Sequence, residues 1–204
     1  MNTTPTERTL LLMDRPWGEL GSDERIIEAA NSVYNEVGSF PLPLSIVAER
    51  AGVSRSLIYS HFPDQFTLTN RLIDQHVAII APEISRILSR EKRFRQACFA
   101  LSDLLFLHFV RHGRLLFRAT QDEFMRQAPN PALARLLRQT LMRLTRLAAR
   151  QFELKPNDAL FIILIMSAIP EEAARLVSTG QASFETGKAT LERTLKLTLH
   201  TLEK

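Results

Sequence analysis

The sequence has one cysteine, one tryptophan, two tyrosines and seven glycines among its 204 residues, and its hydrophobic runs are short. The single cysteine, Cys98, excludes an internal disulfide and a zinc site made of several cysteines. A membrane-spanning helix needs about 18 consecutive apolar residues. The best candidate, residues 159–170, is shorter and is followed by two glutamates. No secretory signal is evident, so we expect a cytoplasmic protein with no membrane partner.

The sequence also lacks the motifs of common enzymes and cofactor sites. It has no nucleophile elbow, no phosphate-binding loop, no metal-ligand helix motif and no pair of carboxylates with supporting spacing. His108 and His112 are spaced like metal ligands on one helix, but no third ligand lies nearby in the sequence. The alternatives for this pair are contact with an effector or a solvated helix face. We therefore predict a protein that is not an enzyme and that has no cofactor and no metal.

Apolar residues recur at helical spacing along almost the whole chain, and no segment shows the alternation typical of a strand. We predict an all-α protein in which Ser22 caps the first helix and Pro82 interrupts a long one. The apolar stripe of the first helix includes Val37. The predicted helices cover residues 23–37, 44–51, 54–62, 65–80, 83–111, 114–127, 131–153, 156–178 and 184–202.

Residues 44–62 have the pattern of a helix-turn-helix, in which two short helices cross around a tight turn. Ala48 is small where the helices touch, and Gly52 tolerates the left-handed backbone of the turn. Ser54 caps the second helix, and Ile58 and Phe62 face inward from it. The remaining side chains suit entry into a major groove of double-stranded DNA, with contacts to bases and phosphates: Arg55, Ser56, Leu57, Tyr59, Ser60 and His61.

Charge is distributed unevenly along the chain. Residues 23–81 contain four arginines and seven acidic residues, a net charge of −3, although the whole chain has a net charge of +4. Residues 84–155 contain fifteen basic and five acidic residues, a net charge of +10. The prediction of DNA binding therefore depends on the helix-turn-helix motif and not on bulk charge.

The segment Ala48-Glu49-Arg50-Ala51-Gly52-Val53-Ser54, followed by Leu57-Ile58-Tyr59-Ser60-His61-Phe62-Pro63-Asp64, resembles the signature of the tetracycline-repressor-like (TetR) family. The Tyr-x-His-Phe ending is its specific part. The resemblance implies a homodimer that binds a palindromic operator and releases it when a small-molecule effector binds the C-terminal domain. It places DNA contacts at Ser45, Arg55, Ser56, Leu57, Tyr59 and His61, and we add Ser54 and Ser60 to the candidate site.

Two positions depart from the pattern of that family. Gln65 stands where the family usually has a phosphate-binding lysine, and Pro43-Leu44 stands where the second helix usually begins with Thr or Ser. Both changes remove phosphate contacts. Because each lost contact flattens the salt dependence of binding by roughly 0.9 in log–log slope, we expect weak non-specific binding and a shallow slope.

We divide the chain into a flexible arm (residues 1–21), a helix-turn-helix DNA-binding domain with a linking helix (residues 22–81), and a helical bundle for effector binding and dimerisation (residues 82–204). The predicted function is sequence-specific transcriptional regulation, as a repressor that an effector releases from its operator. The alternative is a helical dimerisation or adaptor protein whose DNA-binding face is vestigial, which the acidic first domain keeps open.

Phenylalanines are concentrated between residues 94 and 124, where they form either an ordinary core or the lining of an apolar effector cavity. In the second case His108 and Arg118 would orient a polar end of the effector. Cys98 is typical of a small core residue rather than a redox sensor. The candidate effector residues are Phe99, Phe106, His108, Phe109, Arg118 and Phe124.

The last two predicted helices are candidates for a homodimer interface. The first is apolar nearly all round, and the second has a stripe at three- and four-residue spacing, so both need burial. Burial within one chain is the alternative. The residues are Ala159, Leu160, Ile162, Ile163, Ile165, Met166 and Ile169 in the first helix, and Leu191, Leu195, Leu199 and Leu202 in the second.

Arginines recur on the helix that precedes these two, at Arg135, Arg138, Arg143, Arg146 and Arg150. A solvated helix face is one interpretation of this set. An anionic effector site or a second contact surface is the other.

Overall fold

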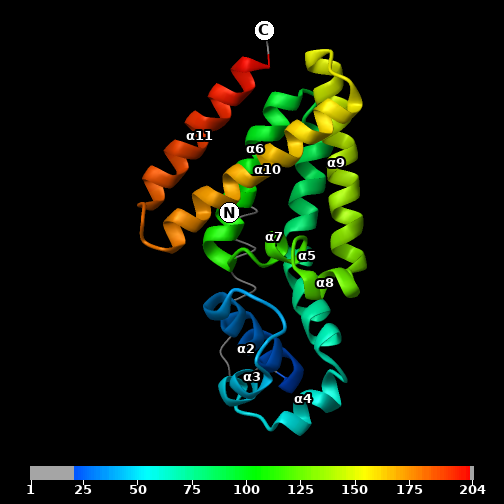
Figure 1. Ribbon diagram of the computed structural model, residues 1–204, viewed down its shortest axis with the longest axis vertical. Coiled ribbons are helices and arrows are strands. Elements are labelled where there is room, and N and C mark those ends of the chain that lie inside the picture. The colour runs from blue at the N-terminus through cyan, green and yellow to red at the C-terminus, as the bar shows by residue number, and fades with distance from the viewer. Residues whose placement is uncertain (1–20, 203–204) are drawn as a thin grey trace, which may run out of the picture. The chain divides into compact units, whose positions relative to one another are not determined.

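The computed structural model describes residues 21–202, which form ten helices and no strand, so the all-α prediction is confirmed within this range. Of the predicted N-terminal arm, residues 1–20 lie outside the described residues. The helices are α2 (Ser22–Val37), α3 (Leu44–Ala51), α4 (Arg55–His61), α5 (Gln65–Arg90), α6 (Phe94–His112), α7 (Leu115–Ala119), α8 (Glu123–Gln127), α9 (Pro131–Phe152), α10 (Pro156–Ser178) and α11 (Phe184–Thr201) (Figure 1). None of the helices in the described range is long and apolar enough to cross a membrane.

The chain forms two compact units, whose described parts are residues 21–79 with 119–130, and residues 80–118 with 131–202. Residues 65–79 of α5 belong to the first unit and residues 80–90 to the second. The sequence suggests a single boundary near residue 81. The membership of residues 119–130 in the first unit is therefore not evident from the sequence alone.

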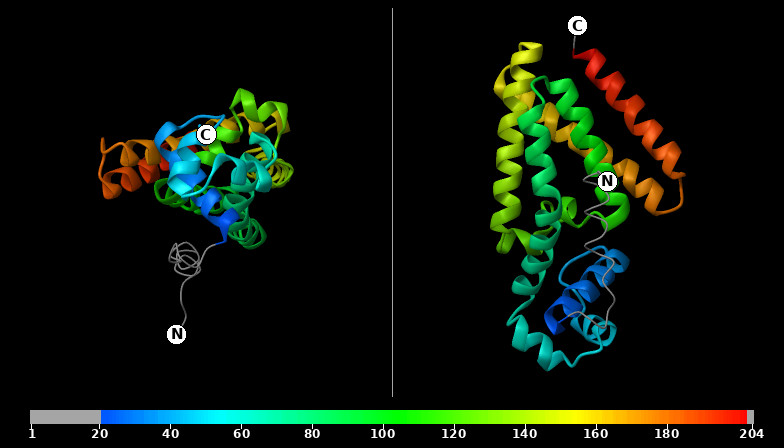
Figure 2. Two further views of the ribbon diagram at one scale, coloured as in Figure 1. Left: turned by 90° about the horizontal axis from the view of Figure 1, so that it is seen from below. Right: turned by 180° about the vertical axis from the view of Figure 1, so that it is seen from behind.

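In the first unit, α2 packs against α3 and α4 (Figure 2). Its buried stripe includes Ile26, Ile27 and Val33, but Val37 is exposed, contrary to the prediction, because it lies at the end of the helix beside Gly38. The prediction that Ser22 caps α2 is also wrong. Gly21 is the cap residue, and its N–H donates to Oε2 of Glu24 at 3.3 Å.

The helix α5 continues through Pro82 to Arg90, whereas we predict an interruption there. Proline removes one backbone hydrogen bond, which normally kinks or ends a helix. Here Ile80, Ile84 and Ile87 form one buried stripe that crosses the proline, while Pro82 itself is exposed. The helix instead ends before residues 91–93, so the predicted helix over residues 83–111 is divided between α5 and α6.

The predicted helix over residues 114–127 is also two helices, α7 and α8. Asp122 separates them, because its carboxylate accepts from the backbone N–H of Phe124 at 2.9 Å and begins a new helix. The ring of Phe124 stacks on Phe66 of α5 with 4.1 Å between centroids. Nδ2 of Asn130 donates to Oδ1 of Asp74 at 2.9 Å. These contacts attach residues 119–130 to the first unit.

In the second unit, α6 packs on α9, α10 and α11, and α10 also contacts α9 and α11. This arrangement buries α6 on several sides, including Phe94 and Phe106. The helices α10 and α11 approach closely at Gly187, where a Cβ atom would collide with Cγ2 of Val177. No larger residue fits at this position unless the Val177 side chain or one of the two helices moves.

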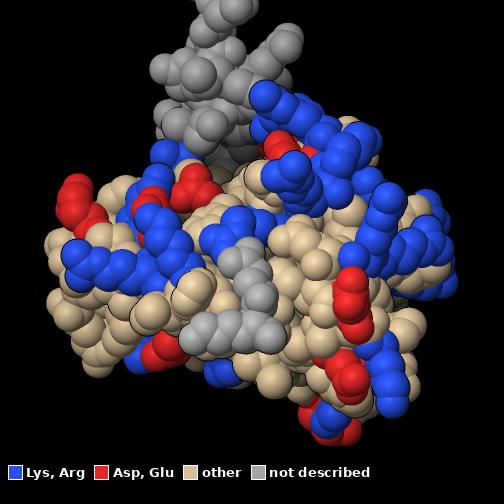
Figure 3. Space-filling view, turned by 90° about the horizontal axis from the view of Figure 1, so that it is seen from above, with Lys and Arg blue, Asp and Glu red and all other residues tan. Residues whose placement is uncertain are grey.

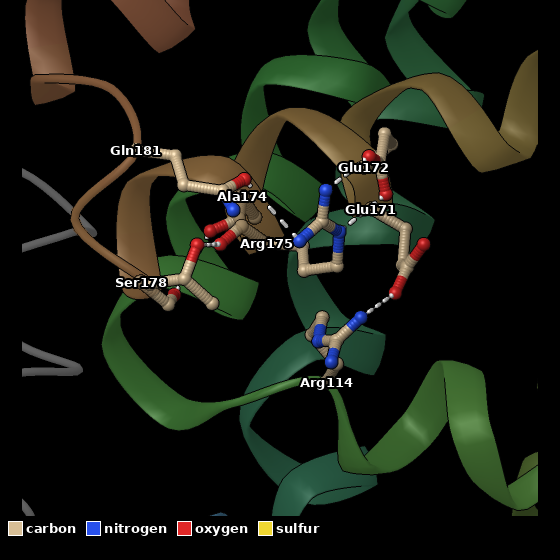
Figure 4. Close-up of polar contacts among 8 residues, drawn as sticks. Arg114, Glu171, Glu172, Ala174, Arg175, Ser178 and Gln181 are labelled. Atoms are coloured by element: carbon tan, nitrogen blue, oxygen red, sulfur yellow. Dashed lines mark hydrogen bonds and ion pairs between the residues drawn. The ribbon is translucent and has the colours of Figure 1, made fainter.

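An ion pair joins the turn that follows α6 to the helix α10 (Figure 4). Nη1 of Arg114 donates to Oε1 of Glu171 at 2.5 Å, and the Glu171 side chain is only 10% exposed. On the same helix Arg175 donates to both carboxylate oxygens of Glu172, at 2.8 and 2.6 Å, and this contact lowers the pKa of Glu172. The carboxylates that follow Pro170 are therefore both neutralised by arginine.

Candidate nucleic-acid interface

The turn between α3 and α4 has the predicted geometry. Gly52 has φ 65° and ψ 39°, in the left-handed region, and its N–H bonds the last carbonyls of α3. Ser54 precedes α4, and its hydroxyl accepts from the backbone N–H of Leu57 at 3.1 Å. The predicted inward residues are all buried: Val47, Ala48, Ala51, Ile58 and Phe62. The predicted helix-turn-helix is therefore confirmed as a packed structure.

The opposite side of α4 is exposed. Tyr59 is 46% exposed and Leu57 36% exposed, although both are large enough to gain from burial. Arg55 and Ser56 are exposed as well, and no hydrogen bond or ion pair joins Arg55 to another described residue. Ser45 is exposed on α3. The fold therefore leaves these five candidate residues accessible to a partner.

Three other candidate residues have hydrogen bonds within the chain. Ser54 accepts at the helix cap, so its hydroxyl hydrogen stays available. Ser60 uses its hydroxyl hydrogen on the carbonyl of Leu57 at 2.8 Å, which weakens it as a phosphate donor. Nε2 of His61 lies 2.8 Å from Oγ of Ser22, so α2 orients the imidazole ring. When Ser22 is the donor, Nδ1–H of His61 is free to donate to a phosphate.

Arg50, within the signature segment, is held inside the first unit. Its guanidinium donates to Oε1 and Oε2 of Glu36 at 2.6 and 2.8 Å, and to Oγ of Ser32 at 2.8 Å. The hydrogen bonds from Arg50 lower the pKa of Glu36. This arginine fastens α3 to α2 and contributes little positive charge to a DNA-facing surface.

Gln65 has a structural role that its identity alone does not reveal. Its Oε1 accepts from the N–H of Leu42 at 3.1 Å, and its Nε2 donates to the carbonyl of Leu42 at 2.8 Å. The side chain thus satisfies both backbone groups of a residue in the connector before α3. It ties the first turn of α5 to the entrance of the helix-turn-helix. At this position the predicted loss of a phosphate contact is therefore accompanied by two hydrogen bonds that hold the connector before α3 in place.

Replacement of Gln65 by alanine is expected to destabilise the protein by about 1–3 kcal/mol, because two part-buried hydrogen bonds of about 0.5–1.5 kcal/mol each are lost. The change can be measured by urea unfolding followed by circular dichroism. Gln75→Ala is the matched control, since Gln75 lies on the same helix and no hydrogen bond joins its side chain to another described residue. Equal unfolding midpoints for both variants would contradict the structural role of Gln65.

The candidate effector residues do not all come together. Phe106, His108 and Phe109 are buried on α6, and Phe99 on the same helix is partly buried. Arg118 is exposed, and Phe124 lies in the first unit, stacked on Phe66. The rings of Phe106 and Phe184 lie 5.5 Å apart between centroids, with Phe106 buried and Phe184 38% exposed.

The titratable side chains of α6 are buried to different degrees. Burial raises the pKa of the Cys98 thiol to about 11, which favours its interpretation as a core residue, since reactive cysteines have lowered pKa values. Burial also lowers the pKa of His112, with a smaller effect from Arg111. The rings of His108 and His112 lie 5.0 Å apart, and within residues 21–202 no group of three potential metal ligands includes them.

Comparison with known proteins agrees with this geometry. Residues 26–68, from α2 to the start of α5, match the model of the family described as bacterial regulatory proteins, tetR family. This segment contains the whole helix-turn-helix and the side chains that support it.

Solved structures extend the likeness to the rest of the chain. The fatty acid degradation regulator FadR of Bacillus halodurans aligns with a TM-score of 0.63 at 18% identity, over 89% of this chain and 96% of FadR. FadR of Bacillus subtilis, solved with stearoyl-CoA, aligns with a TM-score of 0.62 at 17% identity, over 85% and 96% of the two chains. A TetR variant of Acinetobacter baumannii, solved with minocycline, aligns with a TM-score of 0.57 at 19% identity, over 87% and 94%.

At these identities the solved structures establish the fold, and the family model identifies the DNA-binding segment. Residues 26–68 therefore form a segment of the family described as bacterial regulatory proteins, tetR family, in a chain that shares the fold of solved TetR-like regulators.

Proposed function

We propose that the protein is a transcriptional repressor that binds a palindromic operator as a homodimer and releases it when a small molecule binds the second unit. The observation that carries the proposal is the outward face of α4, where Arg55, Leu57 and Tyr59 are exposed and have no evident structural role. Arginine pairs in bidentate fashion with guanine, and a leucine side chain can pack on a thymine methyl group. The protein would act in the cytoplasm, where a bacterial operator lies.

Dimerisation is supported by apolar residues that the fold leaves exposed. Phe161, Leu164 and Ile165 lie on one face of α10, and Phe161 and Ile165 are 62% and 72% exposed. Leu197 of α11 is 69% exposed. Adjacent exposed side chains of this size are typical of a protein–protein interface. Of the side chains predicted for the interface, Ile165 is exposed on this face, whereas Leu191, Leu195 and Leu199 are buried within the chain, as are Ala159, Ile163 and Met166.

The effector class is suggested by the buried surface of α6. Its aromatic side chains, with His108 and Ser102 as buried polar groups, suit a largely apolar molecule with one polar end. The structural neighbours include proteins solved with stearoyl-CoA and with minocycline, which are both larger than a simple metabolite. Phe99, Phe106, His108 and Phe109 are the residues that we propose for contact. The exposure of Arg118 and the position of Phe124 give these two less support.

The proposal is tested by a mobility-shift assay of the full-length protein with the DNA upstream of its own coding region, at two salt concentrations. We expect specific binding that competitor DNA does not remove. The small number of unpaired cations around α4 also predicts that α4 itself contributes little to the salt slope, about 0.9 less for each phosphate contact that is absent there. Absence of specific binding to any upstream fragment, in a protein that dimerises, would favour the adaptor interpretation, which the −3 charge of residues 23–81 supports.

A further inference from the structure

The helix α9 has a charge pattern that the proposed function does not use. Over its 22 residues it contains five arginines and no aspartate or glutamate. We call Arg135, Arg138, Arg143, Arg146 and Arg150 the α9 arginine surface. Four of them are exposed, and Arg143 is partly exposed. The opposite side of the helix is buried in the second unit through Leu133, Leu144, Leu147 and Ala148.

The five arginines have no partners within the described residues, whereas other arginines of the same unit do. Arg86 pairs with Glu83, Arg114 with Glu171, and Arg175 with Glu172. Two of these pairs use a glutamate three residues away on the same helix, an arrangement that α9 could also accommodate. The five arginines of α9 form no hydrogen bond or ion pair with another described residue.

This arrangement of like charges destabilises α9 within the isolated chain. Arg135 and Arg138 are three residues apart, as are Arg143 and Arg146, and Arg150 follows Arg146 by four. Like charges at these spacings destabilise a helix. No contact within the described chain offsets the repulsion. A partner with dense negative charge would turn this unfavourable repulsion into a favourable attraction between the arginines and the partner.

Further cations lie next to the C-terminal end of α9. The backbone N–H of Phe94 donates to Oε1 of Gln151 at 2.8 Å, and the rings of Phe94 and Phe152 pack edge to face. These contacts bring the exposed Lys92 and Arg93 beside the last turn of α9. Figure 3 looks onto the end of the second unit where α9 passes into α10. Lys and Arg side chains crowd its upper right, with few acidic side chains among them.

We propose that the α9 arginine surface binds the phosphates of duplex DNA without sequence preference. This inference rests on the proposed function for its choice of partner, because DNA is the polyanion that the protein already meets through α4. From Arg135 to Arg150 the helix rises about 22 Å. A duplex presents about 13 phosphates over that length, and guanidinium groups bind phosphate oxygens in bidentate fashion.

Two other partners fit the surface less well. Tight binding to an anionic membrane is strengthened by an apolar face that inserts beside the cations. The apolar face of α9 is instead packed in its own unit, and of its large apolar side chains only Leu137 and Met142 are exposed. The acidic first unit of a second copy has a lower charge density than DNA, and one of its carboxylates, Glu36, is already paired with Arg50. Neither matches a row of five unpaired arginines as well as a phosphate backbone does.

The test uses the full-length protein with Arg55→Ala and Tyr59→Ala, so that α4 no longer dominates binding. The probe is a labelled duplex of about 30 base pairs, roughly three helical turns, without an operator. Its anisotropy is followed between about 50 and 200 mM salt. The test variant adds Arg138→Gln, Arg146→Gln and Arg150→Gln to this background. The matched control carries lysine at the same three positions, which preserves the charge.

We expect the glutamine variant to lose up to about 2.7 of the log–log salt slope for each protomer that contacts the probe, because up to three contacts per protomer disappear at about 0.9 each. Its affinity at about 0.1 M salt should fall at least about tenfold, and the lysine control should keep both values. Equal slopes in the glutamine variant and its background would overturn the proposal, as would a background protein that does not bind the probe at the lowest salt.

Two control measurements separate the other partners. Arginine-dependent binding to phosphatidylserine vesicles without DNA binding would overturn the proposal in favour of a membrane. A change in self-association caused by the glutamine substitutions, without any change in DNA binding, would overturn it in favour of a second copy. Operator binding by the unmodified protein is measured separately, so failure of the proposed function and failure of this inference are distinguishable.

Discussion

Substitution of Phe161 and Ile165 by arginine is expected to convert the protein to a monomer and to abolish high-affinity operator binding. These two side chains are the most exposed large apolar groups on α10. Burial of each stabilises an interface by about 1.5–3 kcal/mol, and symmetry repeats the loss in the second protomer. The dissociation constant of the dimer should therefore rise at least about 100-fold. Sedimentation equilibrium measures this change.

Met142→Arg is the matched control for the dimer. Met142 is 50% exposed on α9 of the same unit, so the substitution introduces the same group at an exposed apolar position outside the proposed interface. It should leave the oligomeric state unchanged. Because all three residues are exposed, none of the variants should unfold, which circular dichroism can verify. If the double variant sediments as a dimer, the proposed interface on α10 is wrong.

Alanine at Arg55 or Tyr59 is expected to weaken operator binding by about 1–3 kcal/mol at each position, which is roughly a factor of five to 150. The reason is that both side chains are exposed on the outward face of α4 and take part in no packing that the substitution would damage. Arg55→Ala should also relax the preference for one base pair, whereas a phosphate contact would be lost equally on all sequences. Anisotropy titrations with operator variants distinguish these two results.

Arg50→Ala provides the control for charge. It removes one arginine from the same unit, but the guanidinium of Arg50 is paired with Glu36 and bonded to Ser32. Its effect on operator affinity should be small, and its main effect should be on stability. If Arg50→Ala weakens binding as much as Arg55→Ala does, bulk charge rather than the α4 surface controls DNA binding.

The helix-turn-helix could be predicted from the sequence because its determinants are local. Gly52 is needed for a left-handed turn, Ser54 for a helix cap, and Ile58 with Phe62 for an inward face at four-residue spacing. Each of these preferences acts within a few residues. They agree with one another, so the pattern fixes both the position of the turn and the side of α4 that stays exposed.

The errors arose where contacts distant in sequence outweigh local preference. Pro82 is a strong local signal for the end of a helix, yet the buried stripe of Ile80, Ile84 and Ile87 continues the helix past it. Apolar periodicity alone does not reveal the cap at Asp122, which divides residues 114–127. The position of Phe124 in the first unit depends on its stacking with Phe66, 58 positions earlier in the chain.

The helical class, the position of the turn at Gly52 and the exposed side of α4 follow from the amino-acid sequence, since spacing, caps and one glycine act over short distances. Which apolar stripes are buried within the chain, and which stay exposed, depends on tertiary packing. Leu191 and Ile165 look equally apolar in the sequence, but one is buried and the other is exposed. That difference depends on which helices pack together. Apolar periodicity shows which side of a helix is apolar, but it does not show which element packs against that side.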